Sequence, residues 1–314
     1  MILSHPSTKG TDPLSDVLGV LGARSIRRTR LEAAGSWGLA FAAQDRLKFV
    51  AVVRGHAWAM LPGRAPLRLA DGDVCLLGRT AYAVASHPGA AMTEGAPLFR
   101  AEASEVVRLG GADTVMLGGG IAFTEHTADF LFDALPPFLL LPASSGASAT
   151  TAWLLSKLER EATTPRPGSA LVAARLAEIL LVEAIRAEAA APATIRPGWI
   201  AALADRQVGA ALRLMHGDVA FPWTVQLVAR RIGMSRSAFA ARFLTQVGRP
   251  PMDYLCHWRM VLAQAALRSG EVTAAAVAER VGYASQSAFA QAYRRFFGYP
   301  PGHTRRDIAP PPPG

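Results

Sequence analysis

Two stretches in the last third of the chain carry side chains whose types and spacing suit contact with nucleic acid. Residues 229–251 are ARRIGMSRSAFAARFLTQVGRPP, and residues 278–301 repeat the pattern as AERVGYASQSAFAQAYRRFFGYPP. Arginine and glutamine can make paired hydrogen bonds to base edges, arginine also contacts phosphates, and small residues allow a close approach. A helix that lies in a major groove needs this combination, so we expect both stretches to bind DNA.

Each stretch has the pattern of a helix-turn-helix unit. A Thr N-cap opens a short helix, a glycine ends it in a tight turn, a Ser N-cap opens a second helix, and Gly and Pro end the unit. The matched positions in the two copies are Thr224 and Thr273, Gly233 and Gly282, Ser235 and Ser285, Gly248 and Gly298, and Pro250-Pro251 and Pro300-Pro301. The first helices are therefore predicted as VQLVARR and AAAVAER.

The second helix of each unit has an expected inner face and an expected outer face. The residues predicted to point inward are Ala238, Phe239 and Phe243 in the first copy, and Ala288, Phe289 and Tyr293 in the second. The residues predicted to face outward are Arg236, Ser237, Ala240, Ala241 and Arg242, and Gln286, Ser287, Ala290, Gln291, Arg294 and Arg295. Neither outer face contains Asp or Glu, which favours DNA binding over a duplicated helical hairpin that only packs.

The segment between the copies, MDYLCHWRMVLAQAALRSG at 252–270, has apolar residues at helical spacing and predicts one long helix. At 1.5 Å per residue, this helix can hold the two units roughly 25 Å apart or more, near the ~34 Å of one turn of B-DNA. One copy of the chain is therefore expected to contact two successive major grooves on one side of a duplex.

The 314-residue chain has a net charge of +9, and the excess positive charge lies entirely in its last third. Residues 1–205 contain nineteen Lys and Arg against nineteen Asp and Glu, whereas residues 206–306 contain fourteen Arg and four acidic residues. A solvated basic surface or a polyanionic partner would each explain this imbalance. The length predicts about two domains, and the apolar content of 51% is ample for more than one core.

The sequence predicts no membrane span, secretory signal or cysteine-based site. The longest apolar run, residues 130–141, is interrupted by Asp133 and two prolines and falls short of the roughly twenty residues of a membrane helix. The N-terminus lacks a basic segment followed by an apolar one, so we expect a cytoplasmic protein. Cys75 and Cys256 are too few for a disulfide framework or a thiolate metal site, and we interpret both as small buried apolar residues.

The first part of the chain is predicted to form a β-rich domain. DPLSDVLGVLG, residues 12–22, has the Asp-Pro start of a short helix. Short apolar runs separated by turn residues follow from Trp37 to Leu117, among them KFVAVVRG, HAWAML, LRLADGDVCLLG and AYAVAS. We interpret this region as an all-β module of the small-barrel type.

Helical spacing returns in the segments 151–161 and 169–190. The second of these helices is apolar enough to need a partner surface, which is the barrel, a second subunit or both. Two prolines and a glycine in residues 191–199 indicate a domain boundary, and the final IAPPPPG is expected to be a disordered or polyproline tail.

With these motifs in place, residues 206–306 resemble the DNA-binding domain of the AraC/XylS family of bacterial transcription regulators. The resemblance extends from YLCHWRMVLAQAAL in the joining helix to VGYASQSAFAQAYRRFFGYPP at the end. It implies recognition helices that start near Ser235 and Ser285. The implied base-contacting positions are Arg236, Ser237, Ala241, Gln286, Ser287 and Gln291, of which Ala241 departs from the long polar residue often found there.

The N-terminal half resembles the cupin-like sensor domain found in one branch of the same family. The stretches that carry this resemblance are DPLSDVLGVLGARS, SWGLAF, KFVAVVRGHAWAML, LADGDVCLLGR, FLFDALPPFLLL and ARLAEILLVEAIRA. The resemblance implies a small-molecule effector in the barrel, a homodimer formed through helices in 150–190, and RNA polymerase as a further partner. Trp37, His56, Trp58 and Tyr82 are our candidates for the effector pocket.

The residues do not predict a catalytic site. Metal cupins hold iron or zinc with a His-x-His pair, a carboxylate and a further His, but the sequence has no His-x-His, and Tyr82 stands where the late histidine would be expected. His56, His87 and His126 remain as scattered candidates. We interpret Gly118–Gly120 as a glycine turn without a phosphate-binding Lys, and no nucleophile motif is present. We therefore expect no cofactor.

The sequence thus predicts an α+β protein with four parts: a cupin-like β-barrel with dimerisation helices (1–190), a linker (191–205), a DNA-binding domain with two helix-turn-helix units (206–306), and a tail (307–314). Its predicted function is sequence-specific, effector-controlled regulation of transcription. The alternatives are a metal-dependent cupin enzyme with a DNA-binding tail, and a constitutive nucleoid or RNA-binding protein without a sensor. The effector, the operator and the sign of regulation do not follow from these residues.

Overall fold

The computed structural model describes residues 12–22, 24–101, 106–123, 128–144, 148–164, 166–190, 197–270 and 272–306. The chain divides into two compact units. One unit consists of Ala23–Phe123 and Leu135–Glu188; we call it the β unit. The other, the helical unit, consists of Met1–Gly22, Thr124–Ala134 and Ala189–Gly314. Two segments from the first half of the chain therefore belong to the helical unit.

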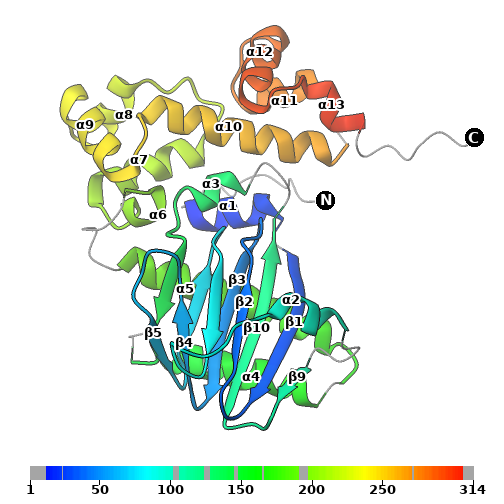
Figure 1. The fold of residues 1–314 in the computed structure, drawn as a ribbon. Helices are drawn as coiled ribbons and strands as arrows, with labels where there is room; N and C mark the ends of the chain where they lie inside the picture. The colour runs from blue at the N-terminus through cyan, green and yellow to red at the C-terminus, as the bar shows by residue number, and fades with distance from the viewer. Residues whose placement is uncertain are drawn as a thin grey trace, which may run out of the picture. The chain divides into compact units, whose positions relative to one another are not determined.

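The β unit contains two sheets (Figure 1). Within the described residues, one sheet has the strand order β11-β6-β3-β10-β1-β9 and the other β5-β4-β7-β2-β8. The strands are β1 (Arg24–Ala33), β2 (Gly38–Phe41), β3 (Leu47–Arg54), β4 (His56–Met60), β5 (Leu67–Ala70), β6 (Val74–Leu77), β7 (Tyr82–Ala85), β8 (Thr93–Glu94), β9 (Val106–Leu109), β10 (Thr114–Ala122) and β11 (Phe138–Leu141). The β-rich architecture predicted from the sequence is confirmed, whereas a closed barrel is not.

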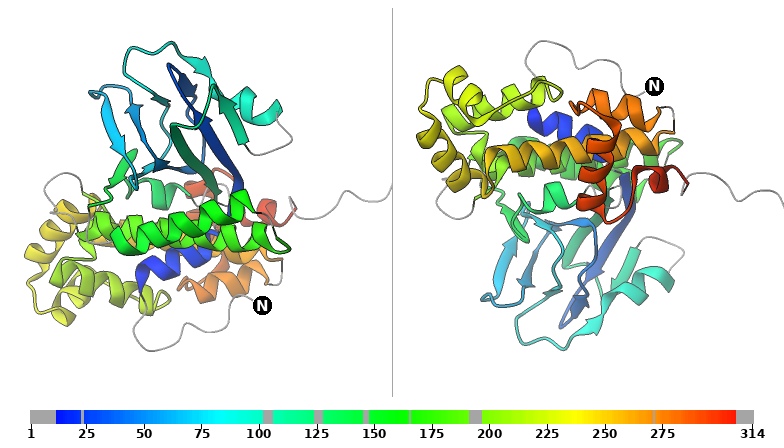
Figure 2. Two further views of the ribbon diagram at one scale, coloured as in Figure 1. Left: turned by 90° about the horizontal axis from the view of Figure 1, so that it is seen from below. Right: turned by 90° about the horizontal axis from the view of Figure 1, so that it is seen from above.

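The core of the β unit lies between the two sheets, which face each other in Figure 2 (left). Leu31, Val52 and Met116 come from the first sheet, and Leu39 and Val84 come from the second. Alternation of side chains along each strand turns one face of each sheet toward the other, so the apolar runs of the sequence meet in one cluster.

The prediction of a turn at Gly118–Gly120 is wrong. These glycines lie within β10, where Gly118 pairs with Thr29 of β1 and with Val50 of β3. A Cβ on Gly119 would lie 2.4 Å from the Phe49 ring, and one on Gly118 would lie 2.7 Å from the Thr29 hydroxyl oxygen. The glycines are therefore needed for close approach of side chains across a strand, not for turning the chain.

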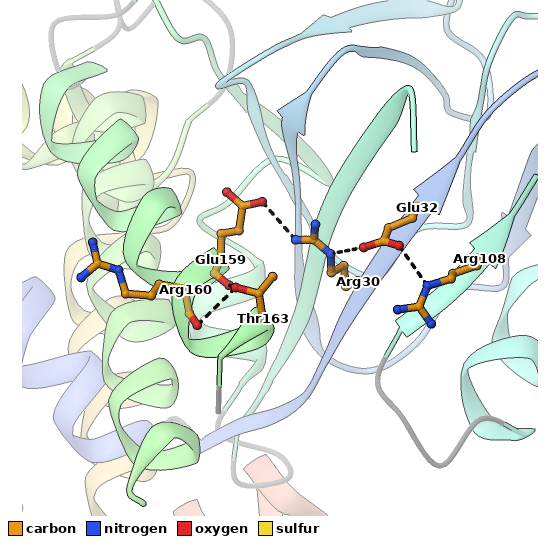
Figure 3. A network of polar contacts seen from close by, with 6 residues as sticks. All are labelled: Arg30, Glu32, Arg108, Glu159, Arg160 and Thr163. Atoms are coloured by element: carbon orange, nitrogen blue, oxygen red, sulfur yellow. Dashed lines mark hydrogen bonds and ion pairs between the residues drawn. The ribbon is translucent and has the colours of Figure 1, made fainter. Parts of the chain in front are cut away.

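Two helices complete the β unit, in agreement with the predicted helical segments: α4 (Ser148–Thr163) and α5 (Ser169–Ala190), whose last residues fall in the helical unit. A short helix, α2 (Gly95–Ala101), precedes β9. Helix α4 contacts the six-stranded sheet, and a chain of ion pairs joins the two (Figure 3). The Arg30 guanidinium on β1 binds Glu32 at 2.8 Å and Glu159 of α4 at 3.1 Å, and Glu32 also binds Arg108 of β9 at 3.1 Å.

The helical unit begins with α1 (Pro13–Leu21), which has the predicted Asp12 N-cap and Pro13 at its first position. It also contains α3 (Asp129–Phe132). The further helices are α6 (Trp199–Ala202), α7 (Arg206–Gly217), α8 (Val225–Arg231), α9 (Arg236–Val247), α10 (Pro251–Arg268), α11 (Ala274–Arg280), α12 (Gln286–Phe297) and α13 (Pro301–Arg306). Residues 191–196 of the predicted linker, His126 and the predicted tail 307–314 lie outside the described residues.

The segment with α3 packs into an aromatic cluster of the helical unit. The Phe130 ring contacts the Trp199, Tyr254 and Trp258 rings at centroid distances of 5.6, 5.4 and 5.4 Å. The Trp199 indole nitrogen donates to the Phe130 carbonyl oxygen at 3.0 Å, and Arg249 pairs with Asp133. Helix α1 contacts α7 and α10. These contacts explain why both segments belong to this unit.

Candidate nucleic-acid interface and ligand cavity

The two helix-turn-helix units share the same hydrogen bonds at matched positions. The side chains of Thr224 and Thr273 accept from backbone amides three residues later, as do those of Ser235 and Ser285. In both turns the amide three residues beyond the last helical residue donates to a carbonyl oxygen five residues back: Met234 to Ala229 and Tyr283 to Ala278, each at 2.9 Å. This is the Schellman arrangement, which requires a left-handed residue, supplied here by Gly233 (φ 72°) and Gly282 (φ 79°).

Each helix-turn-helix unit buries aromatic side chains of its second helix. Phe239 and Phe243 of α9, and Phe289 and Tyr293 of α12, are fully buried, as predicted. The prediction that Ala238 and Ala288 point inward is wrong, because both are exposed. Ala240 and Ala290, which were predicted to face outward, are half-buried. The buried face follows the i, i+4 row through the aromatic residues and includes the positions after Phe239 and Phe289, not those before them.

All nine residues predicted to contact DNA are exposed on α9 and α12. They are Arg236, Ser237, Ala241, Arg242, Gln286, Ser287, Gln291, Arg294 and Arg295. Six of them lie in the first half of a helix, near an N-terminus whose free amides attract phosphate. Contact of these side chains with DNA stays a prediction.

Arg242 differs from the other arginines predicted to contact DNA, because it forms an ion pair with an acidic residue. Its guanidinium binds the Asp205 carboxylate at 2.6 and 3.1 Å. Asp205 is also the N-cap of α7 and accepts from the amides of Gln207 and Val208. Burial acts to raise the pKa of Asp205, but Arg242 and the two amides outweigh it and the pKa lies below its ordinary value.

Helix α10 joins the two units and spans about 27 Å for its 18 residues. It lies between α8–α9 at one end and α11–α12 at the other (Figure 2, right). Its buried side chains include Tyr254 and Trp258 near the first helix-turn-helix unit. Met260 and Leu267, further along α10, belong to the core of the second helix-turn-helix unit. The predicted long joining helix is therefore confirmed.

The β unit contains a cavity of about 350 Å³ between its sheets. Apolar side chains from both sheets line it, including Leu31, Leu39, Val84 and Met116. Its polar lining residues are Thr29, Gln44, Arg46, Lys48, Tyr82 and Arg100. Among the described residues, no Asp or Glu side chain belongs to the lining. The size is at the lower end of the range typical of ligand pockets.

The four sequence-predicted effector residues do not lie together. Tyr82 lines the cavity, whereas the other three are outside its lining. Trp37 is buried in the core between the sheets, His56 is exposed at the start of β4, and Trp58 is half-buried on the same strand. Sequence reasoning missed Arg46 and Lys48, although a lysine within the apolar run LKFVAVV was a usable signal.

Within the described residues, no three His, Cys, Asp or Glu side chains come together to hold a metal ion. His87 donates to or accepts from Ser36 at 3.1 Å on the surface. Cys75 is buried and unpaired, as predicted, but Cys256 is only half-buried, with its sulfur 3.6 Å from the Tyr283 hydroxyl oxygen. Nor does any described helix combine the length and the hydrophobicity of a membrane span.

Two capped helix-turn-helix units on a common long helix are typical of DNA-binding proteins, and the β unit of the same chain has a cavity between its sheets. Comparison with known proteins gives the same class. The Cupin family matches residues 12–190, and the Helix-turn-helix domain family matches residues 228–307.

Full-length relatives extend this result. An AraC-like transcription regulator of Streptomyces antibioticus is 38% identical over 95% of this chain and 100% of its own length. Another from Streptomyces lividans is 39% identical over 94% and 98%. The regulator AlkR of Acinetobacter baylyi is 27% identical over 94% and 99%. The chain belongs to the family of AraC-like transcription regulators and has a cupin domain in its N-terminal part.

Proposed function

We propose that α9 and α12 enter two successive major grooves and determine the operator sequence. This proposal depends on one observation: both helix-turn-helix units have the same caps and turns, their predicted base-contacting side chains are exposed on α9 and α12, and the single helix α10 joins them. Arg236 and Gln286 stand one position after the Ser N-caps and differ in chemistry, so the two units prefer different bases. The operator half-site is therefore two unlike elements about 10 base pairs apart.

The test is selection of sites from random duplex DNA with the purified full-length protein, followed by affinity measurements on two variants. Gln286→Ala should cost about 1 to 3 kcal/mol and relax the preference at one site position. Arg294→Ala should weaken binding to all sequences alike, and it should reduce the slope of log affinity against log salt concentration by about one. The reverse pattern would contradict the assignment, and equal affinity for RNA, random DNA and selected DNA would favour the nucleoid or RNA-binding alternative.

The cavity of the β unit is proposed as the effector site, coupled to the helical unit through the chain itself. Strands β1 and β10 both line the cavity and pair with each other. The chain enters β1 from α1, and it leaves β10 toward the segment with α3, so each cavity strand is next to an element anchored on the DNA-binding helices. A ligand that shifts β1 against β10 would change the strain on these anchors.

A ligand-responsive regulator of this type should bind paired sites as a homodimer. Helices α4 and α5 expose Trp153, Leu171, Val172 and Ile179, with exposed fractions of 55%, 63%, 45% and 45%. An apolar helix surface of this kind is typical of an interface, and we assign it to a second copy of the chain. Leu171→Glu with Ile179→Glu should give a monomer in sedimentation analysis, whereas the control Met92→Glu, at another exposed apolar position, should not.

The enzyme alternative receives no support from the relatives, which are named as transcription regulators. We propose that the β unit senses a ligand without transforming it. Metal analysis of the purified protein tests this proposal, because stoichiometric iron or zinc would revive the cupin enzyme. Contact with RNA polymerase and a cytoplasmic location stay predictions.

A further inference from the structure

The wall of the cavity carries three cationic side chains, and two of them, Arg46 and Lys48, lie close together. Lys48 begins the apolar run of β3, and its ammonium lies over the Phe41 ring at 5.0 Å and the Tyr82 ring at 5.2 Å. These rings face each other as a cross-strand pair of β2 and β7, stacked at 4.8 Å. Arg46, two residues before Lys48, lines the same cavity.

Within the described residues, no carboxylate lies in the cavity lining to balance the charge of this pair. In the described part of the chain, neither Arg46 nor Lys48 forms an ion pair with a carboxylate, and the buried Arg46 Nε has no hydrogen-bond partner. Burial and, to a smaller extent, the nearby Arg46 together lower the pKa of Lys48 to about 8. The stacked rings compensate part of this cost, because ring faces attract cations, but they carry no net charge.

A ligand that relieves this imbalance has to be an anion, and the remainder of the cavity has to accommodate its other end. Beyond the cations, most lining side chains are apolar, such as Leu31, Leu39, Val84 and Met116, and the neutral polar ones are Thr29, Gln44 and Tyr82. A small hydrophilic anion would leave this apolar surface without a partner. A neutral apolar molecule would leave the cations unpaired.

We propose that the cavity binds an organic carboxylate with an apolar body, its carboxylate held by Lys48 and Arg46 and its body lying between the two sheets. This inference rests on the proposed role of the cavity as the effector site. Arginine suits a carboxylate because its planar donors match the two oxygens, and Lys48 adds a second charge at the rim of the aromatic pair. The effector is thus sought among aryl and medium-chain alkyl carboxylic acids.

The test uses calorimetric titration of the full-length protein with octanoate and 2-naphthoate, and with octanamide, 2-naphthamide and acetate as matched probes. The expected result is binding of either acid at least tenfold tighter than its own amide, and no measurable binding of acetate. Equal affinities for acid and amide would overturn the proposal. So would the absence of binding by both acids in a preparation that still binds DNA.

Two lysine variants locate the site. Lys48→Met should weaken binding of the acid at least tenfold while leaving the amide unchanged. Lys157→Met is the control, because the Lys157 ammonium also lies over a ring, Trp153 at 5.8 Å, but on α4 and outside the cavity. Equal effects of the two variants would overturn the assignment of Lys48.

The pH dependence and DNA binding separate the two levels of the proposal. Affinity for the acid should fall as the pH rises above about 8, where Lys48 loses its proton. The other titratable groups of the lining are Arg46, Arg100 and Tyr82, and burial raises the pKa of Tyr82 above its ordinary value. If the acids bind through Lys48 but leave DNA affinity unchanged, the ligand class stands and the effector role fails. If DNA binding responds only to a ligand without a carboxylate, the ligand class fails and the effector role stands.

Discussion

The two turn glycines provide a matched test of the helix-turn-helix geometry. Both adopt the left-handed conformation, so Gly233→Ala and Gly282→Ala each cost about 1 kcal/mol of stability from the backbone alone. Their surroundings differ. A Cβ on Gly233 meets nothing within 4 Å, whereas one on Gly282 would lie 2.4 Å from the Ala220 carbonyl oxygen and 2.8 Å from the Ala220 Cα.

The segment around Ala220 has little freedom to move away from an added Cβ. Arg259 of α10 donates to the carbonyl oxygens of Val219 and Phe221, each at 2.9 Å. Displacing this segment strains both bonds, which adds about 1 to 3 kcal/mol, the usual cost of overpacking. The loss for Gly282→Ala is therefore about 2 to 4 kcal/mol, against about 1 kcal/mol for Gly233→Ala.

Urea denaturation of the full-length protein, followed by far-ultraviolet circular dichroism, measures both losses in the helical transition. The same variants should differ in DNA affinity in the same order, because the turn of the second unit sets the angle of α12. Equal losses for the two substitutions would refute the argument from Ala220, and no loss for either would refute the left-handed turns.

Three further predictions concern charged groups. Arg30→Met should lower the free energy of unfolding by about 2 kcal/mol, because Glu159 loses its partner and Glu32 keeps only the exposed Arg108. Arg108→Met, at the exposed end of the same network, should change it by less than about 0.5 kcal/mol, and thermal denaturation distinguishes the two variants. Burial and the adjacent Arg249 lower the pKa of His257 from 6.5 to about 4. As the pH falls, this histidine is therefore protonated in the unfolded state before it is protonated in the folded state. The free energy of unfolding of the helical unit should decrease by about 3 kcal/mol between pH 7 and pH 4. His257→Asn should flatten this part of the pH profile, and an unchanged profile would exclude His257 as its source. Asp205→Asn keeps an N-cap for α7 but releases Arg242, so affinity for random duplex DNA should rise at low salt; a fall would show that the ion pair positions Arg242 for binding.

The helical part of the fold could be predicted closely because its signals are local. Thr and Ser caps, turn glycines and the spacing of Phe239 and Phe243 are all written within a few residues of the elements that they define. The inner and outer positions of Ala238 and Ala240 were interchanged, because alanine is compatible with either side of the buried row and only the tertiary packing decides.

The β unit was less predictable because its decisive contacts join distant residues. Strand β1, RSIRRTRLEA, has five charged residues, and its buried Arg30 is compatible with a strand only because Glu159 lies 129 positions away to pair with it. The glycines of β10 indicate a turn in the sequence, yet Phe49 and Thr29 need them within a sheet. The cavity likewise depends on contacts between residues far apart in the sequence, such as that of Lys48 on β3 with the Tyr82 ring on β7.

The central claim is that one copy of the chain contacts two successive major grooves through unlike recognition helices. Guanine-methylation interference on a selected site, measured with the wild-type protein and with Arg236→Ala and Gln286→Ala, tests it most directly. The account predicts two clusters of interfering positions about 10 base pairs apart on one side of the duplex, each lost in only one of the two variants. A single cluster, or the loss of the same cluster in both variants, would contradict it.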